Sequence, residues 1–360
     1  MRLRGLITPG LISILMCTLL MACDDSGVKP EYKTRNRGVF ICNEGNFTFG
    51  NASLSYYDPD SLRVYNQVFY NTNLFPPGDV IQSMTIRDSI GFMVINNSGK
   101  ILVINKNSFK HIATISGLNS PRYMKIAGPA KGYVTDLYTK SIAIINPLTY
   151  EITGSIPVGA STEQLVLHGE DMYVAGWSMN NKIYKIDTRS DSLIDSLTVT
   201  LQPNSIVSDR NNMLWVLSDG AYEGSPAGHE IAALTKIDPV SFTIQHAFTF
   251  PGIEYSPSGL CINSTGDSIY YINGSWSGSG NQDKGVYKMS VDAVSLPDAP
   301  IIPEKKRLFY GLGVDPVNSD IYVSDALDYL QKGWVFRYSA GGYQLDSFKV
   351  DIAPGSFCFK

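Results

Sequence analysis

The sequence predicts an all-β protein, a seven-bladed β-propeller built from four-stranded blades. Three observations lead to this prediction. A strand that ends at a turn-forming residue recurs seven times along the chain. β-Branched and aromatic residues dominate these segments, and a helical period is nowhere sustained. One strand is left over at the C-terminus, and a closed ring has a place for it.

The recurring element is a short strand followed by a turn. Its marker residue, Asp or Asn in most copies, stands at positions 58, 105, 146, 187, 238, 290 and 339. A second strand bounded by Gly, Asn or Asp precedes each copy, as in Gly132–Asp136 and Leu214–Ser218. Asp and Asn side chains close a turn by accepting a hydrogen bond from the backbone two residues later. Units of about 48 residues with about four strands each are typical of propeller blades.

The first and last units are incomplete in complementary ways. Residues 38–70 supply three strands, whereas the last unit is already complete when Gly355–Phe359 begins. We expect this final segment to become the innermost strand of the first blade and to close the ring. An open solenoid or two β-sandwich domains would leave it without a role. The topology also places Cys358 beside the strand of Cys42. Free buried thiols are the favoured interpretation, and a disulfide between these two is the open alternative.

Residues 1–22 have the features of a secretory signal peptide. Two arginines precede an apolar segment from Leu6 to Leu20, and Ala22 stands directly before Cys23. A Cys after a small residue resembles the bacterial lipoprotein signal, so Cys23 is the predicted lipidation site. The alternative, a transmembrane anchor, is disfavoured because the apolar run is short and interrupted by a Pro-Gly pair.

The predicted organisation is therefore a signal peptide (1–22), a lipid-anchored tether (23–36) and the propeller (37–360). Acidic residues directly after Cys23 resemble the export signal of surface lipoproteins in some Gram-negative bacteria. In other bacteria Asp at this place retains a lipoprotein at the inner membrane, so sorting stays open. We expect a protein of the outer membrane that is surface-exposed and contacts the membrane through its lipid only.

The composition excludes two classes of protein. The 360 residues carry a formal net charge of −4 without any basic run, so we expect no nucleic-acid partner. The hydrophobic content of 44% is enough for a packed core and excludes a disordered chain.

Candidate ligand-binding residues come from one face of the predicted ring. In a propeller the loops that follow the second strand of each blade share a face with the loops between blades. Four of them are long (43–52, 218–230, 273–285 and 325–333), and unequal loops indicate function because the scaffold does not need them. The innermost strands open on this face with the polar or aromatic residues Gln82, Arg122, Glu163, Asn204, Ser258, Tyr310 and Ser356.

The resulting set of candidates combines aromatic loop residues with polar residues of the channel. Aromatic side chains on Gly- and Ser-rich loops resemble a recognition surface. The alternatives are packing at blade corners for the aromatic residues and plain channel lining for the polar ones. The candidates are Phe49, Arg122, Tyr138, Gln164, Trp177, Asn204, Tyr222, His229, Trp276 and Tyr329.

Catalytic patterns are missing from the sequence. The four histidines have no metal-ligand spacing, and there is no paired Cys motif, nucleophile elbow or phosphate loop. We therefore expect no catalytic residue, no metal and no prosthetic group. An enzyme stays open, because propeller lyases and lactonases assemble their sites from dispersed residues; His229 is then the candidate base.

The run Gly38–Asp58 (GVFICNEGNFTFGNASLSYYD) resembles the first blade of the surface-layer-type, YncE-like propeller lipoproteins. The resemblance covers the whole mature chain. It implies a surface lipoprotein that binds cobalamin or a related corrinoid and passes it to a TonB-dependent outer-membrane vitamin B12 transporter. No contact residue is carried over from the family. The alternative is a glycan-binding or adhesion propeller in which Trp177 and Trp276 stack on sugar rings.

Overall fold

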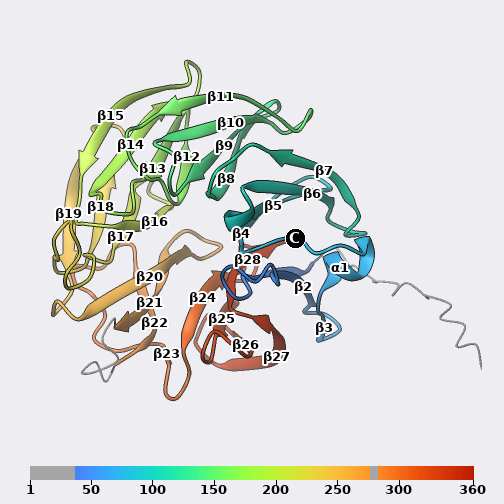
Figure 1. Ribbon diagram of the computed structural model, residues 1–360. Coiled ribbons are helices and arrows are strands. Elements are labelled where there is room, and N and C mark those ends of the chain that lie inside the picture. Colours follow the sequence, from blue (N-terminus) through green and yellow to red (C-terminus); the bar gives the residue numbers. More distant parts are fainter. Residues whose placement is uncertain (1–36, 276–282) are drawn as a thin grey trace, which may run out of the picture.

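The structure is a computed structural model that describes residues 37–275 and 283–360. Within this part of the chain, seven antiparallel four-stranded sheets are arranged in a ring (Figure 1). The predicted seven-bladed β-propeller is confirmed. No helix among the described residues has the length and apolar character needed to cross a membrane.

Each blade has its innermost strand at the channel and its outermost strand at the rim of the ring. From the channel outwards, the first blade contains β28 (Pro354–Phe359), β1 (Val39–Asn43), β2 (Ser53–Asp58) and β3 (Arg63–Tyr65). The second contains β4 (Ile81–Arg87), β5 (Ile90–Ile95), β6 (Lys100–Asn105) and β7 (His111–Ser116). The third contains β8 (Pro121–Gly128), β9 (Lys131–Asp136), β10 (Ser141–Asn146) and β11 (Glu151–Pro157).

The other four blades follow the same order. The fourth contains β12 (Leu165–His168), β13 (Asp171–Ala175), β14 (Lys182–Asp187) and β15 (Ser192–Thr198). The fifth contains β16 (Pro203–Ser208), β17 (Leu214–Ser218), β18 (Ala233–Asp238) and β19 (Thr243–Thr249). The sixth contains β20 (Tyr255–Ile262), β21 (Ser268–Ser275), β22 (Gly285–Ser290) and β23 (Ile302–Pro303). The seventh contains β24 (Phe309–Val314), β25 (Ile321–Asp325), β26 (Lys332–Tyr338) and β27 (Gln344–Ile352).

The C-terminal strand closes the ring as the sequence predicts. β28 pairs antiparallel with β1, so that Phe40 lies opposite Cys358 and Cys42 lies opposite Ser356. Beyond the two strands, the backbone N–H of Lys360 donates to the carbonyl of Gly38 at 2.9 Å. Cys42 and Cys358 are therefore diagonal neighbours, yet both are free thiols in the structure.

The turn between the third and fourth strands is closed by the marker residue of the repeat. The carboxylate of Asp58, the amide oxygen of Asn146 and the carboxylate of Asp238 each accept a backbone hydrogen bond from two residues later, at 2.8–2.9 Å. In the sixth and seventh blades the hydroxyl groups of Ser290 and Ser339 accept longer backbone bonds of 3.2 Å. The predicted turn chemistry is confirmed, and the weaker copies use a weaker acceptor.

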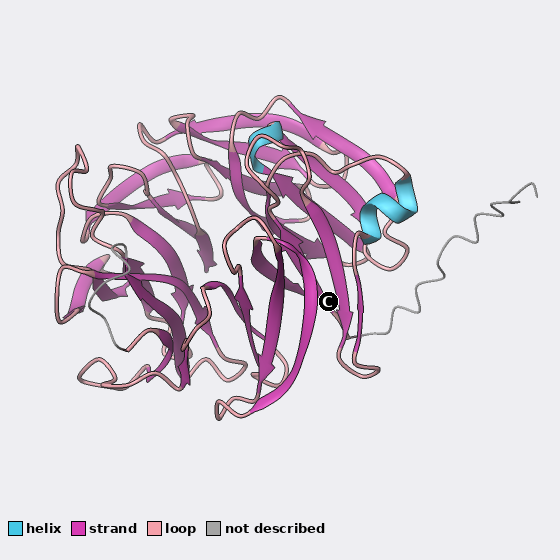
Figure 2. Ribbon diagram, turned by 60° about the horizontal axis from the view of Figure 1, so that its bottom comes forward, coloured by secondary structure: helices cyan, strands magenta, loops and turns pink. Residues whose placement is uncertain are grey.

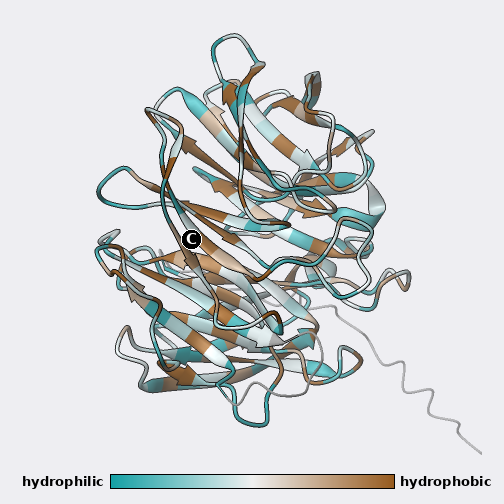
Figure 3. Cartoon of the chain, turned by 90° about the vertical axis from the view of Figure 1, so that its left-hand side faces the viewer, coloured by the Kyte–Doolittle hydropathy of each residue, from teal (hydrophilic) through white to brown (hydrophobic). Residues whose placement is uncertain are grey.

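The hydrophobic core lies between blades. Apolar side chains of the strands pack against the next sheet, as where Tyr133 and Ile144 of the third blade meet Leu165 and Val174 of the fourth. In Figure 3 the hydrophobic residues form bands across the strands, and the loops are mostly hydrophilic. Each blade therefore buries its faces only with the help of its neighbours.

Two features differ from the simple repeat. A short helix, α1 (Val68–Asn73), connects the first and second blades, and a single 3₁₀ turn, η1 (Asn96–Ser98), follows β5 (Figure 2). The outermost strand of the sixth blade, β23, has only two residues. Pro297, Pro300 and Pro303 stand in or before it, and proline lacks the N–H that a strand ladder requires.

Candidate functional site

The loops after the second strands and the starts of the innermost strands meet at one end of the channel. We call the cluster of Glu44, Gln82, Arg122, Glu163, Trp177 and Tyr310 the channel mouth. Contacts between blades hold it together. For example, the Asn46 side chain of the first blade donates to the Tyr329 carbonyl of the seventh at 2.7 Å.

Arg122 organises the channel mouth. From the start of β8 its guanidinium donates two hydrogen bonds of 2.7 Å to the Glu163 carboxylate and one of 2.5 Å to Gln82 Oε1. Its carbon Cζ also lies 5.1 Å from the centre of the Trp177 ring, within cation–π range. Burial alone would lower the Arg122 pKa, but the charge and hydrogen bonds of Glu163 outweigh it and raise the pKa. Arg122 is therefore a fixed positive charge that joins three blades.

A second acid lies across the channel mouth from this pair. Glu44 follows β1 directly, and its carboxylate accepts a hydrogen bond of 2.7 Å from the Tyr310 hydroxyl. Tyr310 packs edge-on against Tyr329, with ring centres 5.1 Å apart. Burial raises the Glu44 pKa, although the Tyr310 hydroxyl and the charge of Arg122 oppose the rise. A Cβ atom at Gly355 would collide with the Glu44 carboxylate, so a larger residue there would displace this side chain.

Two hydrogen-bonding groups of the predicted site residues have no partner. Trp177 Nε1 and His229 Nε2 are both buried and make no hydrogen bond within the part of the chain that the structure describes. A buried polar group without a partner is costly, and it commonly marks a place where water or a ligand binds. Trp177 already lies against Arg122, so its free N–H belongs to the channel mouth.

Gln164 and Asn204 lie at the channel, but their polar atoms connect blades. Gln164 Oε1 accepts the backbone N–H of Ile206 at 3.3 Å, from the fifth blade. Asn204 Nδ2 donates to the Pro257 carbonyl at 3.0 Å, from the sixth. The Ser83 and Ser356 hydroxyls make similar bonds to the next blade. These side chains hold the ring together around the channel.

The remaining aromatic candidates lie on the loops of the same face as the channel mouth. We call these four residues the exposed rim, as distinct from the outer edge of the ring. Phe49 is 76% exposed, Tyr138 68%, Tyr222 46% and Tyr329 42%. Trp276 lies outside the described residues, so the structure does not place it. Large apolar side chains this exposed leave area that a ligand or partner can cover.

Sequence reasoning missed two acids, Glu44 and Asp219. Each directly follows a second strand, at the point where the chain enters a loop of the ligand face. Burial raises the pKa of Asp219 to about 6, although hydrogen bonds from the Ala221 backbone and from Asn204 oppose the rise. These two acids could have been identified by their position, because each stands at the junction between a second strand and a loop of the ligand face.

The channel mouth brings a charged group, hydrogen-bonding groups and an aromatic ring together. Within residues 37–275 and 283–360, no group of His, Cys, Asp and Glu side chains is suited to hold a metal. In the same part of the chain, His229 Nε2 has no hydrogen-bond partner. The channel mouth offers donors, acceptors and aromatic faces to a large polar ligand.

Comparison with solved structures shows the same fold in proteins of diverse kinds. A quinoprotein alcohol dehydrogenase-like protein from Bacteroides thetaiotaomicron superposes with a TM-score of 0.65 at 14% identity, covering 89% of this chain and 78% of its own. The periplasmic gluconolactonase of Pseudomonas aeruginosa gives 0.66 at 10% identity, with coverages of 90% and 98%. A Lactobacillus plantarum protein gives 0.65 at 10% identity, with coverages of 90% and 99%. At these identities the likeness concerns the fold alone.

Sequence comparison is more specific. No curated protein sequence matches the chain. A family profile described as "Domain of unknown function (DUF5074)" matches residues 37–351. This range takes in all seven blades except the closing strand β28. The chain therefore belongs to the DUF5074 family.

Proposed function

We propose that this protein is a lipid-anchored, surface-exposed binding protein of the outer membrane. It captures cobalamin or a related corrinoid at the channel mouth and delivers it to a TonB-dependent transporter. The observation that carries the proposal is Arg122 stacked over Trp177, whose buried Nε1 has no partner in the described chain. The Arg122–Trp177 pair holds an unpartnered N–H group in a fixed position, and a binding site needs polar groups that are fixed in this way.

The ligand class follows from the polar groups on offer. A corrinoid is a large disc with an apolar face and a periphery of carboxamides. Trp177 Nε1 and His229 Nε2 can donate to amide carbonyls. Gln82 and Glu163 supply acceptors for amide N–H groups beside Arg122. The exposed rim, with Phe49 and Tyr138 its most exposed members, supplies apolar area for the disc.

The cellular part of the proposal rests on the sequence. Cys23 follows a signal-peptide pattern and is the proposed lipidation site. It lies outside the described residues. A tethered ligand-binding ring suits capture outside the cell and transfer to a neighbouring transporter.

Isothermal titration calorimetry with cyanocobalamin on residues 24–360 tests the proposal, since the ring is complete within residues 37–360. We expect saturable binding at micromolar protein. Trp177→Phe keeps the ring over Arg122 and removes the N–H, so it should weaken binding about tenfold. Trp334→Phe, on the outer strand pair β26–β27, is the matched control and should leave binding unchanged. An absence of binding heat in the wild type would refute corrinoid capture.

Two alternatives are outcomes of parallel measurements. A glycan array that responds while cyanocobalamin gives no heat would favour a glycan-binding propeller, with Phe49 and Tyr138 as stacking surfaces. Lactone or sugar-acid turnover that disappears in His229→Ala would favour an enzyme with His229 as base. Turnover that persists in this variant would remove His229 from that role.

A further inference from the structure

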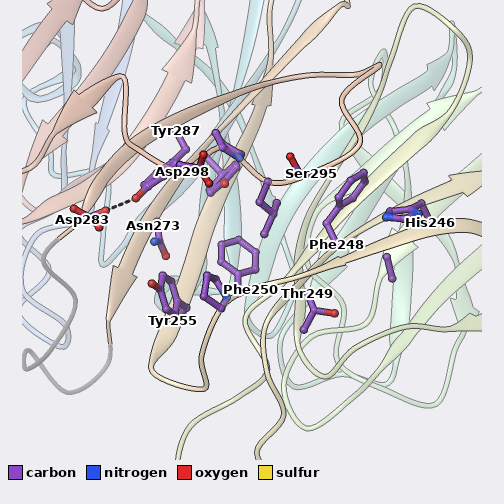
Figure 4. Close-up of a pocket in the computed structure, with 15 residues that line it drawn as sticks. His246, Phe248, Thr249, Phe250, Tyr255, Asn273, Asp283, Tyr287, Ser295 and Asp298 are labelled. Carbon is purple, nitrogen blue, oxygen red and sulfur yellow. Dashed lines mark hydrogen bonds between the residues drawn. The ribbon is translucent and has the colours of Figure 1, made fainter.

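A cavity of about 390 Å³ lies between the fifth and sixth blades (Figure 4). Its walls come from β19 and the segment after it, from β21 and β22, and from residues 295–298. No residue of the channel mouth lines it, so it is separate from the site described above. Its volume falls within the range of small-molecule sites in proteins.

The short outer strand of the sixth blade explains why space remains here. β23 has two residues and pairs only with Gly285 and Val286 of β22. The segment before it, which contains Pro297, crosses the gap between the blades without joining a sheet. The cavity therefore lies where the outer edge of the sixth blade is incomplete.

The floor of the cavity is aromatic and buried. Tyr271 and Tyr287 stack with ring centres 5.5 Å apart and planes inclined by 7°. Phe250 lies edge-on to Tyr271 at 5.7 Å, and Tyr255 lies 6.0 Å from Phe250. In Figure 4 Phe250, Tyr255, Asn273 and Tyr287 surround one space. Such a floor offers π faces, which attract cations more strongly when water is excluded.

The acceptors of the cavity include one buried amide oxygen and two carboxylates. Asn273 is 2% exposed, and its Oδ1 has no hydrogen-bond partner in the described chain. The Tyr287 hydroxyl already donates its proton to the Asp283 carbonyl at 2.6 Å. The exposed edge carries the side chains of Asp283 and Asp298, and neither Lys nor Arg is among the lining residues. The cavity therefore combines a negative edge with an unsatisfied buried acceptor.

We propose that this cavity is a second binding site that takes a small primary ammonium compound with a flat or apolar body. The ammonium group satisfies Asn273 Oδ1 and the negative edge at Asp298, and the body lies on the aromatic floor formed by Phe250 and Tyr287. A neutral sugar could bond to Thr249 and Ser295, but it would bring no positive charge to the Asp298 carboxylate at the exposed edge. The proposal is independent of corrinoid capture, because the two sites share no residue.

Calorimetry of residues 24–360 with tyramine, compared with 4-ethylphenol, tests the role of the charge. The two probes share the phenol ring, and only tyramine carries the ammonium. We expect tyramine to bind at least about tenfold more tightly and its affinity to fall with added salt. Equal affinities, or no detectable heat at millimolar tyramine, would overturn the proposal.

Two variants locate the binding site. Asp298→Asn at the exposed edge should weaken tyramine roughly two- to fivefold. Asp195→Asn on β15 of the fourth blade is the matched control and should change nothing. Phe250→Leu keeps an apolar side chain but removes the ring, and it should weaken tyramine about fivefold with an unchanged circular dichroism spectrum. If Asp298→Asn binds tyramine as well as Asp195→Asn does, the ligand is not held at this cavity and the proposal fails.

Discussion

Two parallel hydrogen bonds of 2.7 Å join the Arg122 guanidinium of the third blade to the Glu163 carboxylate of the fourth. Both side chains are largely buried, with 13% and 5% of their surface exposed. The pair lies between blades, so it is a contact that exists only in the assembled ring. Removing it therefore tests how much this contact between two blades contributes to stability.

We predict that Arg122→Ala lowers the free energy of unfolding by about 3 kcal/mol, because it leaves the Glu163 charge buried and unpaired. The double variant Arg122→Met, Glu163→Leu should recover most of this loss, since an apolar pair of similar size needs no counter-charge. Urea unfolding followed by circular dichroism measures both. Arg189→Ala removes an exposed ion pair with Glu170 and should cost less than about 1 kcal/mol. A double variant as unstable as the single one would contradict this account.

Asp219 makes stability depend on pH in an unusual direction. Its pKa is about 6 in the folded protein and 3.8 in its ordinary state, so the folded chain holds the proton more tightly. Its stabilising contribution is present below about pH 4 and is lost as pH rises through 6. Asp219→Asn removes this loss and keeps an acceptor for the Ala221 N–H. We expect the variant to gain about 2 kcal/mol on the wild type between pH 4 and pH 7.

Urea unfolding at several pH values checks the Asp219 prediction. Asp328→Asn is the control of opposite sign, because hydrogen bonds from Gln331 and the backbone lower the Asp328 pKa to about 2. Its carboxylate should lose stabilising effect only under strongly acidic conditions. An Asp219 variant whose stability runs parallel to the wild type between pH 4 and pH 7 would show that Asp219 is ionised normally.

The three thiols of residues 24–360 should be unreactive in the folded ring. Burial raises the pKa of Cys42 and Cys261 to about 12 and raises that of Cys358 as well. A thiol reacts as its thiolate, so Ellman's reagent at pH 8 should detect almost none in the native protein and three in urea. Detection of a single thiol in urea would show that Cys42 and Cys358 are joined by a disulfide.

The exposed rim should affect binding and not stability. Tyr138→Ala and Phe49→Ser remove side chains that are 68% and 76% exposed, so the free energy of unfolding should change by less than about 0.5 kcal/mol. Both should weaken cyanocobalamin. Tyr343→Ala removes a ring of similar exposure (78%) in the turn between β26 and β27, and it is the control for binding. If Tyr138→Ala and Phe49→Ser bind cyanocobalamin as tightly as the control Tyr343→Ala does, the exposed rim is not part of the binding site.

The fold could be predicted from the sequence because its determinants are local and repeated. Asp58, Asn146 and Asp238 close their turns through a bond to the backbone two residues later, a relation visible in any window of the sequence. The closing strand β28 was predictable from counting strands. The two-residue β23 was not, because the sequence shows prolines but not how the chain crosses between two blades.

The site was predictable in its position and much less in its chemistry. The loops of one face and the strand starts were identified, and Arg122, Trp177 and His229 lie there. The hydrogen-bond partners of these residues could not be predicted. Arg122 and Glu163 are 41 residues apart, and their bond depends on how two sheets face each other. The same holds for Gln164 and Asn204, whose side chains turn out to bind backbone of the next blade.

The N-terminal end of the ring lies away from the channel mouth. Arg37 forms an ion pair of 3.0 Å with Asp315, in the turn between β24 and β25, at the end of the channel opposite the channel mouth. A lipid on Cys23 would therefore hold the ring by its far side, with the binding face turned outward to the medium. Transfer of a ligand to a transporter in the same membrane would then require the ring to rotate, so that the channel mouth faces the membrane. Residues 24–36, fully extended, would span about 45 Å. The length of this segment would then set how far the ring can turn toward a transporter.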